Sequence, residues 1–299
     1  MTGNFRWQPT DANSVVLADN LPVLQDLPTG AFQLIYIDPP FNTGRTQRKQ
    51  TLTTTRSPTG DRTGFKGHTY QTIRRQAIAY DDRWNDYWNF LAPRLIEAWR
   101  VLSPTGTFYL HLDYHEVHYA KVLLDSLFGA DRFLNEIIWA YDYGARSTRK
   151  WPAKHDNILV YVKDPGSYLF DSTAVDREPY MAPGLVTPEK AARGKLPTDV
   201  WWHTIVSPTG REKTGYPNQK PLGILRRIIQ ASSAPGDWVL DFFAGSGTTG
   251  AAATELGRRF VLIDSNPEAF QVMRTRLGTG GCGGTIQYID LAEPQEAAA

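Results

Sequence analysis

Residues 34–44 have the sequence LIYIDPPFNTG, in which an apolar strand runs directly into a carboxylate, two prolines and an aromatic ring. Pro39 and Pro40 fix φ and carry no N–H, so the chain leaves the strand in a stiff, extended turn with free carbonyl groups. Asp38 and Phe41 are then held at the carboxyl edge of the expected sheet, where open α/β sheets bind ligands. The carboxylate can accept hydrogen bonds from an amino group, and Phe41 can stack on a flat ring. A turn that merely ends the strand is the alternative interpretation.

The composition is that of a folded protein. A chain of 299 residues with 41% hydrophobic and 21% charged residues can form one large α/β domain or a core with an inserted module. Cys282 is the only cysteine, which excludes an internal disulfide and a multi-cysteine zinc site. The net charge of +1 gives no overall attraction to nucleic acid, so such binding would depend on local patches. No long apolar run or signal-peptide core is found, and a cytoplasmic protein is expected.

A second ligand-binding turn has the sequence DFFAGSGTTG at residues 241–250. An apolar strand precedes it, a helix follows from Thr248, and the next strand ends in Asp264. Glycines allow close approach of a ligand to the backbone, and the later acid can bond ribose hydroxyls, so this order indicates a nucleoside cofactor. The turn lacks both the three-glycine spacing of dinucleotide folds and the lysine of a phosphate-binding loop. A cofactor without pyrophosphate is therefore expected, and a structural tight turn is the alternative.

Apolar periodicity predicts the regular elements of the core. Helices are expected at residues 21–27, 86–101, 117–127, 221–231, 248–256 and 267–277. Strands are expected at residues 14–20, 34–37, 107–112, 133–140, 157–162, 236–240 and 259–264. His111, Asp113 and His115 cluster at a strand end, but without cysteine or further histidine spacing no metal site is expected.

Two stretches concentrate basic residues. Residues 45–75 have Asp61 as their only acid and are rich in threonine and glycine, which predicts a long loop that closes over an anionic polymer. Residues 141–216 interleave basic and aromatic residues, as sequence reading of a nucleic acid would require. A solvated insertion and an ordinary surface excursion are the respective alternatives. The expected DNA contacts are Arg45, Arg48, Lys49, Arg56, Arg62, Lys66, Arg146, Arg149 and Lys150.

Three motifs together resemble those of one family. The sequence DPPF at residues 38–41 resembles the catalytic motif of DNA amino-methyltransferases, and residues 241–250 resemble their S-adenosylmethionine motif. The sequence TGYPNQKP at residues 214–221 resembles the segment that in this family precedes the first core helix and contacts the methionine part of the cofactor. The order of catalytic motif, recognition region and cofactor motif is that of the beta class. The resemblance spans residues 15–277, and the joint match is more specific than any single motif.

The resemblance implies a Rossmann-like methyltransferase fold: an α/β, circularly permuted, mostly parallel sheet with helices on both faces and an inserted, loop-rich target recognition region. The strands that end at Asp38 and Asp241 would be neighbours at the switch point, so that both turns open on one crevice. The implied parts are a catalytic half at residues 1–140 with the basic loop 45–75, a target recognition region at 141–213, a cofactor-binding half at 214–284, and a C-terminal strand and tail at 285–299.

The implied activity is that of a site-specific DNA methyltransferase, which transfers a methyl group from S-adenosylmethionine to the exocyclic amine of a flipped base in duplex DNA. Asp38 and the Pro39 carbonyl would accept the amine hydrogens. Asp19 and Asn20, which alone predict an Asx turn, would line the cofactor pocket. The implied catalytic residues are Asp38, Pro39, Pro40 and Phe41. The implied cofactor-binding residues are Asp19, Asn20, Asp38, Tyr216, Pro217, Asn218, Lys220, Phe243, Ala244, Gly245, Ser246, Gly247, Thr248, Asp264 and Ser265.

The target base is left open between two amines. An aspartate at the first motif position more often accompanies adenine N6 in such families, and cytosine N4 is the alternative. Carbon-5 methylation is disfavoured because it needs a cysteine nucleophile, normally after proline, whereas Cys282 lies in a glycine-rich tail. A non-catalytic DNA-binding protein of this fold is a remoter alternative and would be expected to lack Asp38. Double-stranded DNA is the expected partner, with no membrane and no metal; a restriction endonuclease and a second copy of the chain are further candidates.

Overall fold

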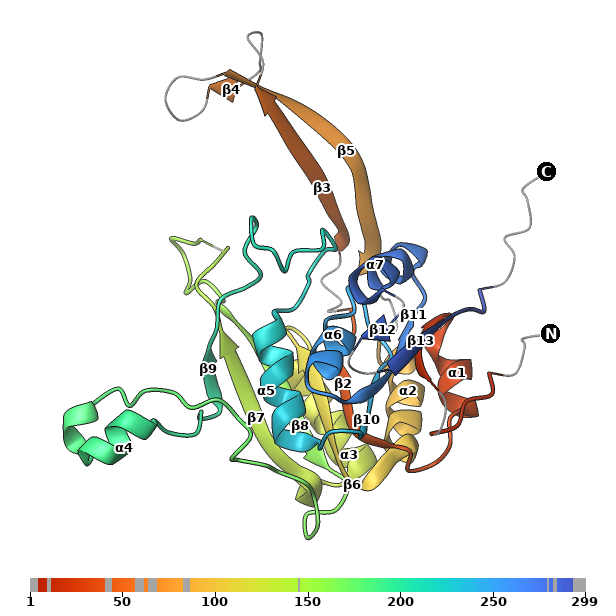
Figure 1. Cartoon of the computed structure of the whole chain (residues 1–299), viewed down its shortest axis with the longest axis vertical. Helices are drawn as coiled ribbons and strands as arrows, with labels where there is room; N and C mark the ends of the chain where they lie inside the picture. The colour runs from red at the N-terminus through yellow and green to blue at the C-terminus, as the bar shows by residue number, and fades with distance from the viewer. Residues whose placement is uncertain are drawn as a thin grey trace.

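A ten-stranded sheet organises the chain and carries helices on both faces (Figure 1). The computed structural model describes residues 5–9, 12–40, 45–56, 62–63, 69–82, 87–144, 146–278, 280–281 and 284–292. The sheet has the order β12-β13-β1-β11-β10-β2-β6-β8-β7-β9. Its strands are β1 (Asn13–Leu17), β2 (Phe32–Ile37), β6 (Leu102–Leu112), β7 (Phe133–Ala140), β8 (His155–Val162), β9 (Val200–Trp202), β10 (Trp238–Asp241), β11 (Arg259–Asp264), β12 (Gly280–Gly281) and β13 (Gly284–Asp290).

The middle of the sheet is parallel. Strands β13, β1, β11, β10, β2 and β6 run parallel in that order, and β2 pairs with β10 through Leu34 opposite Val239 and Ile35 opposite Leu240. Strand β8 pairs antiparallel with both β6 and β7. The predicted adjacency of the strands that end at Asp38 and Asp241 is confirmed, and so is the mostly parallel α/β architecture.

Each face of the sheet has its own hydrophobic core, because successive strand residues point to opposite sides. On β2, Ile35 and Ile37 pack in one core and Leu34 and Tyr36 in the other. The first core is covered by α1 (Asn20–Asp26), α2 (Tyr87–Val101) and α3 (Val117–Phe128), and the second by α5 (Leu222–Ser232), α6 (Thr248–Glu255) and α7 (Pro267–Leu277). Burial on both faces explains why the central strands are continuously apolar.

The basic segment after Asp38 forms strands, so the predicted long loop at residues 45–75 is wrong. Strands β3 (Arg45–Arg56) and β5 (Thr69–Asp82) pair antiparallel, and β4 (Arg62–Thr63) adds to β5. This hairpin extends away from the main sheet (Figure 1). Threonine is β-branched and favours strands, and an antiparallel ribbon does not need an apolar face along its whole length. The prediction took the polar residues as evidence for a loop and did not consider the preference of threonine for strands.

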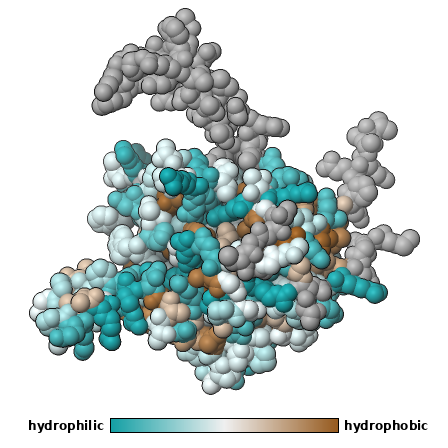
Figure 2. Space-filling view, in the orientation of Figure 1, coloured by the Kyte–Doolittle hydropathy of each residue, from teal (hydrophilic) through white to brown (hydrophobic). Residues whose placement is uncertain are grey.

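The strand expected at residues 107–112 is longer in the structure, because β6 begins at Leu102 and includes residues 103–106. The pairing of β2 with β6 shifts between Phe32 and Leu34, which accommodates the extra residues as a bulge. The short helix α4 (Pro188–Arg193) lies at the end of a lobe beside β9 (Figure 1). On the face shown in Figure 2, hydrophilic residues prevail and the hydrophobic ones form small, separate patches. None of the helices in the described ranges is long and apolar enough to cross a membrane.

Candidate active site

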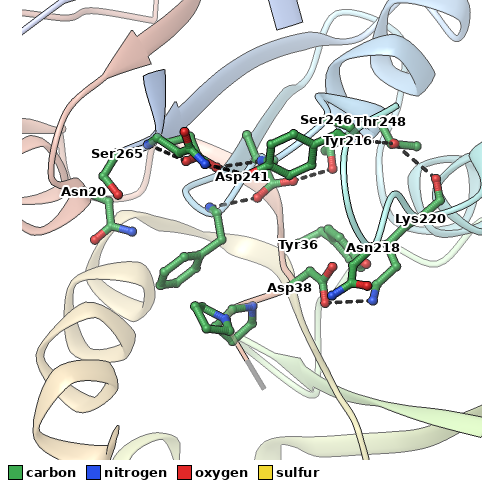
Figure 3. A pocket seen from close by; sticks show the side chains of 18 of the residues that line it. Asn20, Tyr36, Asp38, Tyr216, Asn218, Lys220, Asp241, Ser246, Thr248 and Ser265 are labelled. Carbon is green, nitrogen blue, oxygen red and sulfur yellow. Dashed lines mark hydrogen bonds and ion pairs between the residues drawn. The ribbon is translucent and has the colours of Figure 1, made fainter. Parts of the chain in front are cut away.

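The two turns singled out in the sequence open on one cavity at the carboxyl edge of the sheet. Asp38 follows β2, the glycine-rich turn follows β10, and Asp264 ends β11, the next strand along. All three line a cavity of about 450 Å³, which we call the first cavity. Figure 3 shows Asn20 and Ser265 on one side of it and Asp38, Asn218 and Lys220 on the other. Segments more than 200 residues apart in the chain thus form one site, as the permuted order implies.

The glycine-rich turn is tied to the strand beside it. The Gly245 N–H donates to Asp264 Oδ2 at 2.7 Å, and the Asn266 N–H donates to Oδ1 of the same carboxylate at 2.8 Å. Gly247 has φ of 70°, and a Cβ there would lie 2.7 Å from Met273 Cγ. Only glycine satisfies both the left-handed conformation and the close packing of α7 at this point.

Most of the predicted cofactor-binding residues line the first cavity. Gly247 is the exception, since it faces Met273 and supports the turn from behind. The residues that do line it are Asp19, Asn20, Asp38, Tyr216, Pro217, Asn218, Lys220, Phe243, Ala244, Gly245, Ser246, Thr248, Asp264 and Ser265. Pro39 and Pro40 also line it, whereas Phe41 lies outside the described residues.

Asp19 and Asn20 combine the two roles that the sequence suggested. Asp19 caps α1, because its Oδ1 accepts the Leu21 N–H at 3.1 Å, and it also lines the first cavity. The Asn20 side chain donates to the Phe242 carbonyl at 2.6 Å and so connects α1 to the start of the glycine-rich turn.

Sequence reasoning missed a wall of the cavity contributed by α2. Arg94 is buried, donates to Asp19 Oδ1 at 2.7 Å and also to Asn20 Oδ1, and its guanidinium lies 3.8 Å from the centre of the Phe90 ring. The four-residue spacing of Phe90 and Arg94 places them on one helix face, but no sequence signal connects that face to residues 19–20. The other lining residues missed are Tyr36, Gln219, Leu225, Asp241, Thr249 and Asn266.

Asp38 is a half-buried carboxylate whose nearest cation is Lys220. The Lys220 Nζ lies 3.1 Å from Asp38 Oδ1, within ion-pair range, but no donor in the described part of the chain makes a well-aligned hydrogen bond to that oxygen. Burial raises the pKa of Asp38, and the positive charge of Lys220 opposes this rise. Oδ1 is buried against Lys220, but the Asp38 side chain as a whole is 18% exposed, so the carboxylate can also accept from a ligand that donates N–H groups.

A second cavity, of about 690 Å³, adjoins the first and shares Asn218, Gln219 and Lys220 with it. Trp139 and Tyr141 provide aromatic surface, and Asp156 lies between them and Lys220. Arg146 and Lys150, both predicted to contact DNA, also line this cavity. The segment 218–220 therefore separates two ligand spaces, and Asp38 lies on the first-cavity side of it, 3.1 Å from Lys220 Nζ.

The remaining predicted DNA contacts are distributed over two elements. Arg149 is exposed in the connection between β7 and β8. Arg45, Arg48, Lys49 and Arg56 belong to β3 and Arg62 to β4, while Lys66 lies outside the described residues.

The histidine and acid cluster near the end of β6 is held by internal bonds. Asp113 accepts from the His115 ring at 2.7 Å, and the His111 ring contacts Tyr36 and Asp156 instead. Within the described ranges, no group of three histidine, cysteine or acidic residues could hold a metal ion.

The fold and this pair of cavities define a Rossmann-like transferase that brings a nucleoside cofactor against a second ligand. The family model for N6/N4 DNA methylases matches residues 32–275. The chain belongs to this DNA methylase family.

Relatives and solved structures agree with that assignment. The chain is 29% identical to the Type II methyltransferase M.HpaI of Haemophilus parainfluenzae over 265 residues, covering 88% of this chain and 73% of the relative. It is also 29% identical to the DNA adenine methyltransferase YhdJ of Escherichia coli K12 over 277 residues, covering 89% and 83%. The crystal structure of the M1.HpyAVI–SAM complex matches with a TM-score of 0.56 at 22% identity, covering 89% and 98% of the two chains. The cytosine-N4-specific PvuII DNA methyltransferase matches with a TM-score of 0.60 at 16% identity, covering 89% and 87%.

S-adenosylmethionine is the methyl donor of this family, and the residues of the first cavity fit it. The carboxylates of Asp19 and Asp264 can accept from the hydroxyl and ammonium groups of such a ligand. A Cβ at Gly245 would lie 3.2 Å from the Tyr216 ring, so glycine keeps open the space between that ring and the turn.

Proposed function

We propose that this DNA methyltransferase modifies the N6 amino group of adenine in duplex DNA, with Asp38 accepting the hydrogens of the amine. The supporting observation is the partly exposed Asp38 carboxylate, which lines the first cavity beside Lys220, a residue common to both cavities. An exocyclic amine is a poor nucleophile because its lone pair is delocalised into the ring. Acceptance of its N–H groups by Asp38 and the Pro39 carbonyl localises that lone pair and stabilises the positive charge that develops on nitrogen.

Bound S-adenosylmethionine supplies a methyl group activated by its sulfonium charge. The reaction breaks the carbon–sulfur bond and forms a carbon–nitrogen bond, and the amine nitrogen then loses one proton. Asp38 and the Pro39 carbonyl orient the amine, and Asp38 is placed to accept the proton because burial raises the pKa of its carboxyl group.

The second cavity is the proposed place for the base. A base within a duplex is stacked and cannot reach Asp38, so the nucleotide must leave the helix. Tyr141 can contact its face or edge, and Arg146 and Lys150 can contact flanking phosphates. We assign target recognition to residues 141–213 and backbone contacts to the basic β3–β5 hairpin as well.

The choice of adenine depends on the aspartate at position 38 and on the relation to a protein named as an adenine methyltransferase. Cytosine N4 is the second candidate, because a cytosine-N4-specific enzyme shares the fold. The relation to a Type II methyltransferase supports a restriction endonuclease as a functional partner.

The test is methylation of plasmid DNA by the purified protein, followed by single-molecule sequencing to map modified bases. N6-methyladenine at a defined site is expected. Methylcytosine would replace the adenine assignment, and the absence of any mark would contradict the activity. The Asp38→Ala variant should retain cofactor binding and lose about 10²- to 10³-fold or more in single-turnover rate. An Asp38→Ala protein that methylates at the normal rate would refute the proposed role of the carboxylate.

A further inference from the structure

Asp156 is a buried carboxylate that lines the second cavity and lies within reach of Lys220, which lines both. It lies on β8, and its Oδ1 accepts from the Tyr141 hydroxyl at 3.0 Å. Its Oδ2 lies 3.1 Å from His111 Nε2 and 3.7 Å from Lys220 Nζ. The same ammonium lies 3.1 Å from Asp38 Oδ1. A single buried lysine is therefore shared by two carboxylates, of which one belongs to the DPPF turn.

The His111 ring links Asp156 to Tyr36 of β2, the strand that leads to Asp38. The Tyr36 hydroxyl lies 2.7 Å from His111 Nδ1. Burial, followed by the charge of Asp38, raises the pKa of Tyr36 well above its ordinary value, so its hydroxyl keeps its proton and donates to Nδ1. The imidazole then carries its proton on Nε2 and donates it to Asp156. Tyr36 is the second residue before Asp38, and Lys220 Nζ lies 3.1 Å from Asp38 Oδ1. Both ends of the network Tyr36–His111–Asp156–Lys220 therefore lie next to Asp38.

Lys220 presents a problem for the proposed reaction. Asp38 must turn its oxygens toward the amine, yet one of them faces the Lys220 ammonium. A buried ammonium that loses its partner is costly, because little solvent is present to replace it. Asp156 removes this cost by providing a second carboxylate within reach of the same Nζ. Burial raises the pKa of Asp156, but the hydrogen bond from His111 and the charge of Lys220 outweigh it and lower the pKa to about 2, so Asp156 is charged at neutral pH.

We propose that Asp156 is a positioning residue for methyl transfer: it takes over the Lys220 ammonium when the target amine engages Asp38. This inference rests on the proposed function. The titratable groups that face the two carboxylates are Tyr36 of β2, His111 of β6, Tyr141 after β7, Lys220 before α5 and Asp241 of β10.

Asp156→Asn tests the exchange, since it removes the charge and keeps the shape. Asp38 is then the carboxylate that remains beside the Lys220 ammonium, so the single-turnover rate at saturating DNA and cofactor should fall about 10- to 100-fold. Two effects also lower the pKa of Asp38: the loss of a neighbouring negative charge and the stronger pairing with Lys220. In a plot of single-turnover rate against pH, the acid limb should therefore move to lower pH, and the plateau rate should fall. A lesion that only disturbed packing would lower the plateau without moving the limb.

Asp125→Asn is the matched control. Asp125 also joins a lysine and a tyrosine, with Lys121 Nζ at 2.6 Å and the Tyr161 hydroxyl at 2.7 Å, but it lies on α3 away from both cavities. Its substitution should leave the single-turnover rate and its pH profile unchanged. Cofactor affinity, measured by calorimetry, should stay within about twofold of wild type for both variants.

Lys220→Met provides the second test. In Lys220→Met no ammonium passes from Asp38 to Asp156. Adding Asp156→Asn to Lys220→Met should therefore cause no further loss of single-turnover rate. An equal loss in both backgrounds, or an acid limb that does not move in Asp156→Asn, would overturn the proposal. If Lys220→Met does not fold, the pH profile of Asp156→Asn decides alone. Failure of the wild-type protein to methylate DNA would instead refute the proposed function, so the two outcomes are distinguishable.

Discussion

The buried carboxyl group of Asp241 should make the stability of this enzyme fall as the pH rises. Burial raises its pKa from 3.8 to about 7, although the Thr249 hydroxyl and the Phe243 N–H both donate to it. The folded state therefore holds a proton that the unfolded state releases near pH 4. Stability from this group is fully present below about pH 4 and is lost as the pH rises through about 7.

The size of the effect follows from the two pKa values. The difference between 3.8 and about 7 corresponds to about 4 kcal/mol of unfolding free energy, of which about 2.5 kcal/mol should be lost between about pH 5 and pH 8.5. Asp241→Asn cannot ionise and abolishes this contribution. Relative to the variant, the wild-type protein should therefore lose about 2.5 kcal/mol over that range.

Urea denaturation of both proteins at several pH values measures the difference. Asp199→Asn, at an exposed position before β9, is the control and should track the wild type at every pH. If the free-energy difference between wild type and Asp241→Asn does not change with pH, Asp241 keeps its ordinary pKa and the reasoning from burial is refuted.

Two further predictions concern the turn and the DNA contacts. Gly247→Ala should lower the unfolding free energy by more than the roughly 1–2 kcal/mol cost of the left-handed conformation, because its Cβ would meet Met273. Gly278 is the control, since it has φ of 64° and no atom lies within 4 Å of its Cβ. In the same thermal denaturation assay, Gly278→Ala should show the conformational cost alone. Fluorescence anisotropy titrations measure how the affinity for DNA depends on salt. Replacement of Arg149 and Lys150 by glutamine should reduce the slope of log affinity against log salt concentration by about 1.8. The same change at Lys190 and Arg193 of α4 should leave the slope unchanged. Equal destabilisation by the two alanines, or equal slopes for the two double variants, would contradict these assignments.

The core could be predicted from the sequence because its signals are local. The strands at 133–140 and 259–264 and the helix at 267–277 have the predicted bounds, since apolar periodicity marks a buried element directly. The adjacency of β2 and β10 is not local. It followed from a resemblance to permuted methyltransferases and not from the residues of either strand.

The unpredicted parts depend on contacts across the fold. Arg94 reaches residues 19 and 20 from 75 and 74 positions away, and Asp156 on β8 reaches Lys220 in the segment before α5. Nothing in the neighbouring residues of either side chain indicates its partner. The hairpin at residues 45–82 was missed for a different reason, because its threonines and basic residues resemble a solvated loop when polarity alone is considered.

The short segment of residues 218–220 is a wall common to both cavities. If binding of one ligand shifts this wall and changes the affinity for the other ligand, thermodynamic reciprocity requires the second ligand to change the affinity for the first by the same factor. Under the proposed function, a substitution at residues 218–220 that changes the preference for the target base is therefore expected to change the affinity for the methyl donor as well. Under the proposed function, the opposite wall of the second cavity, in the connection between β7 and β8, does not line the first cavity, so substitutions there can change the contacts to the base and leave the contacts to the methyl donor unchanged.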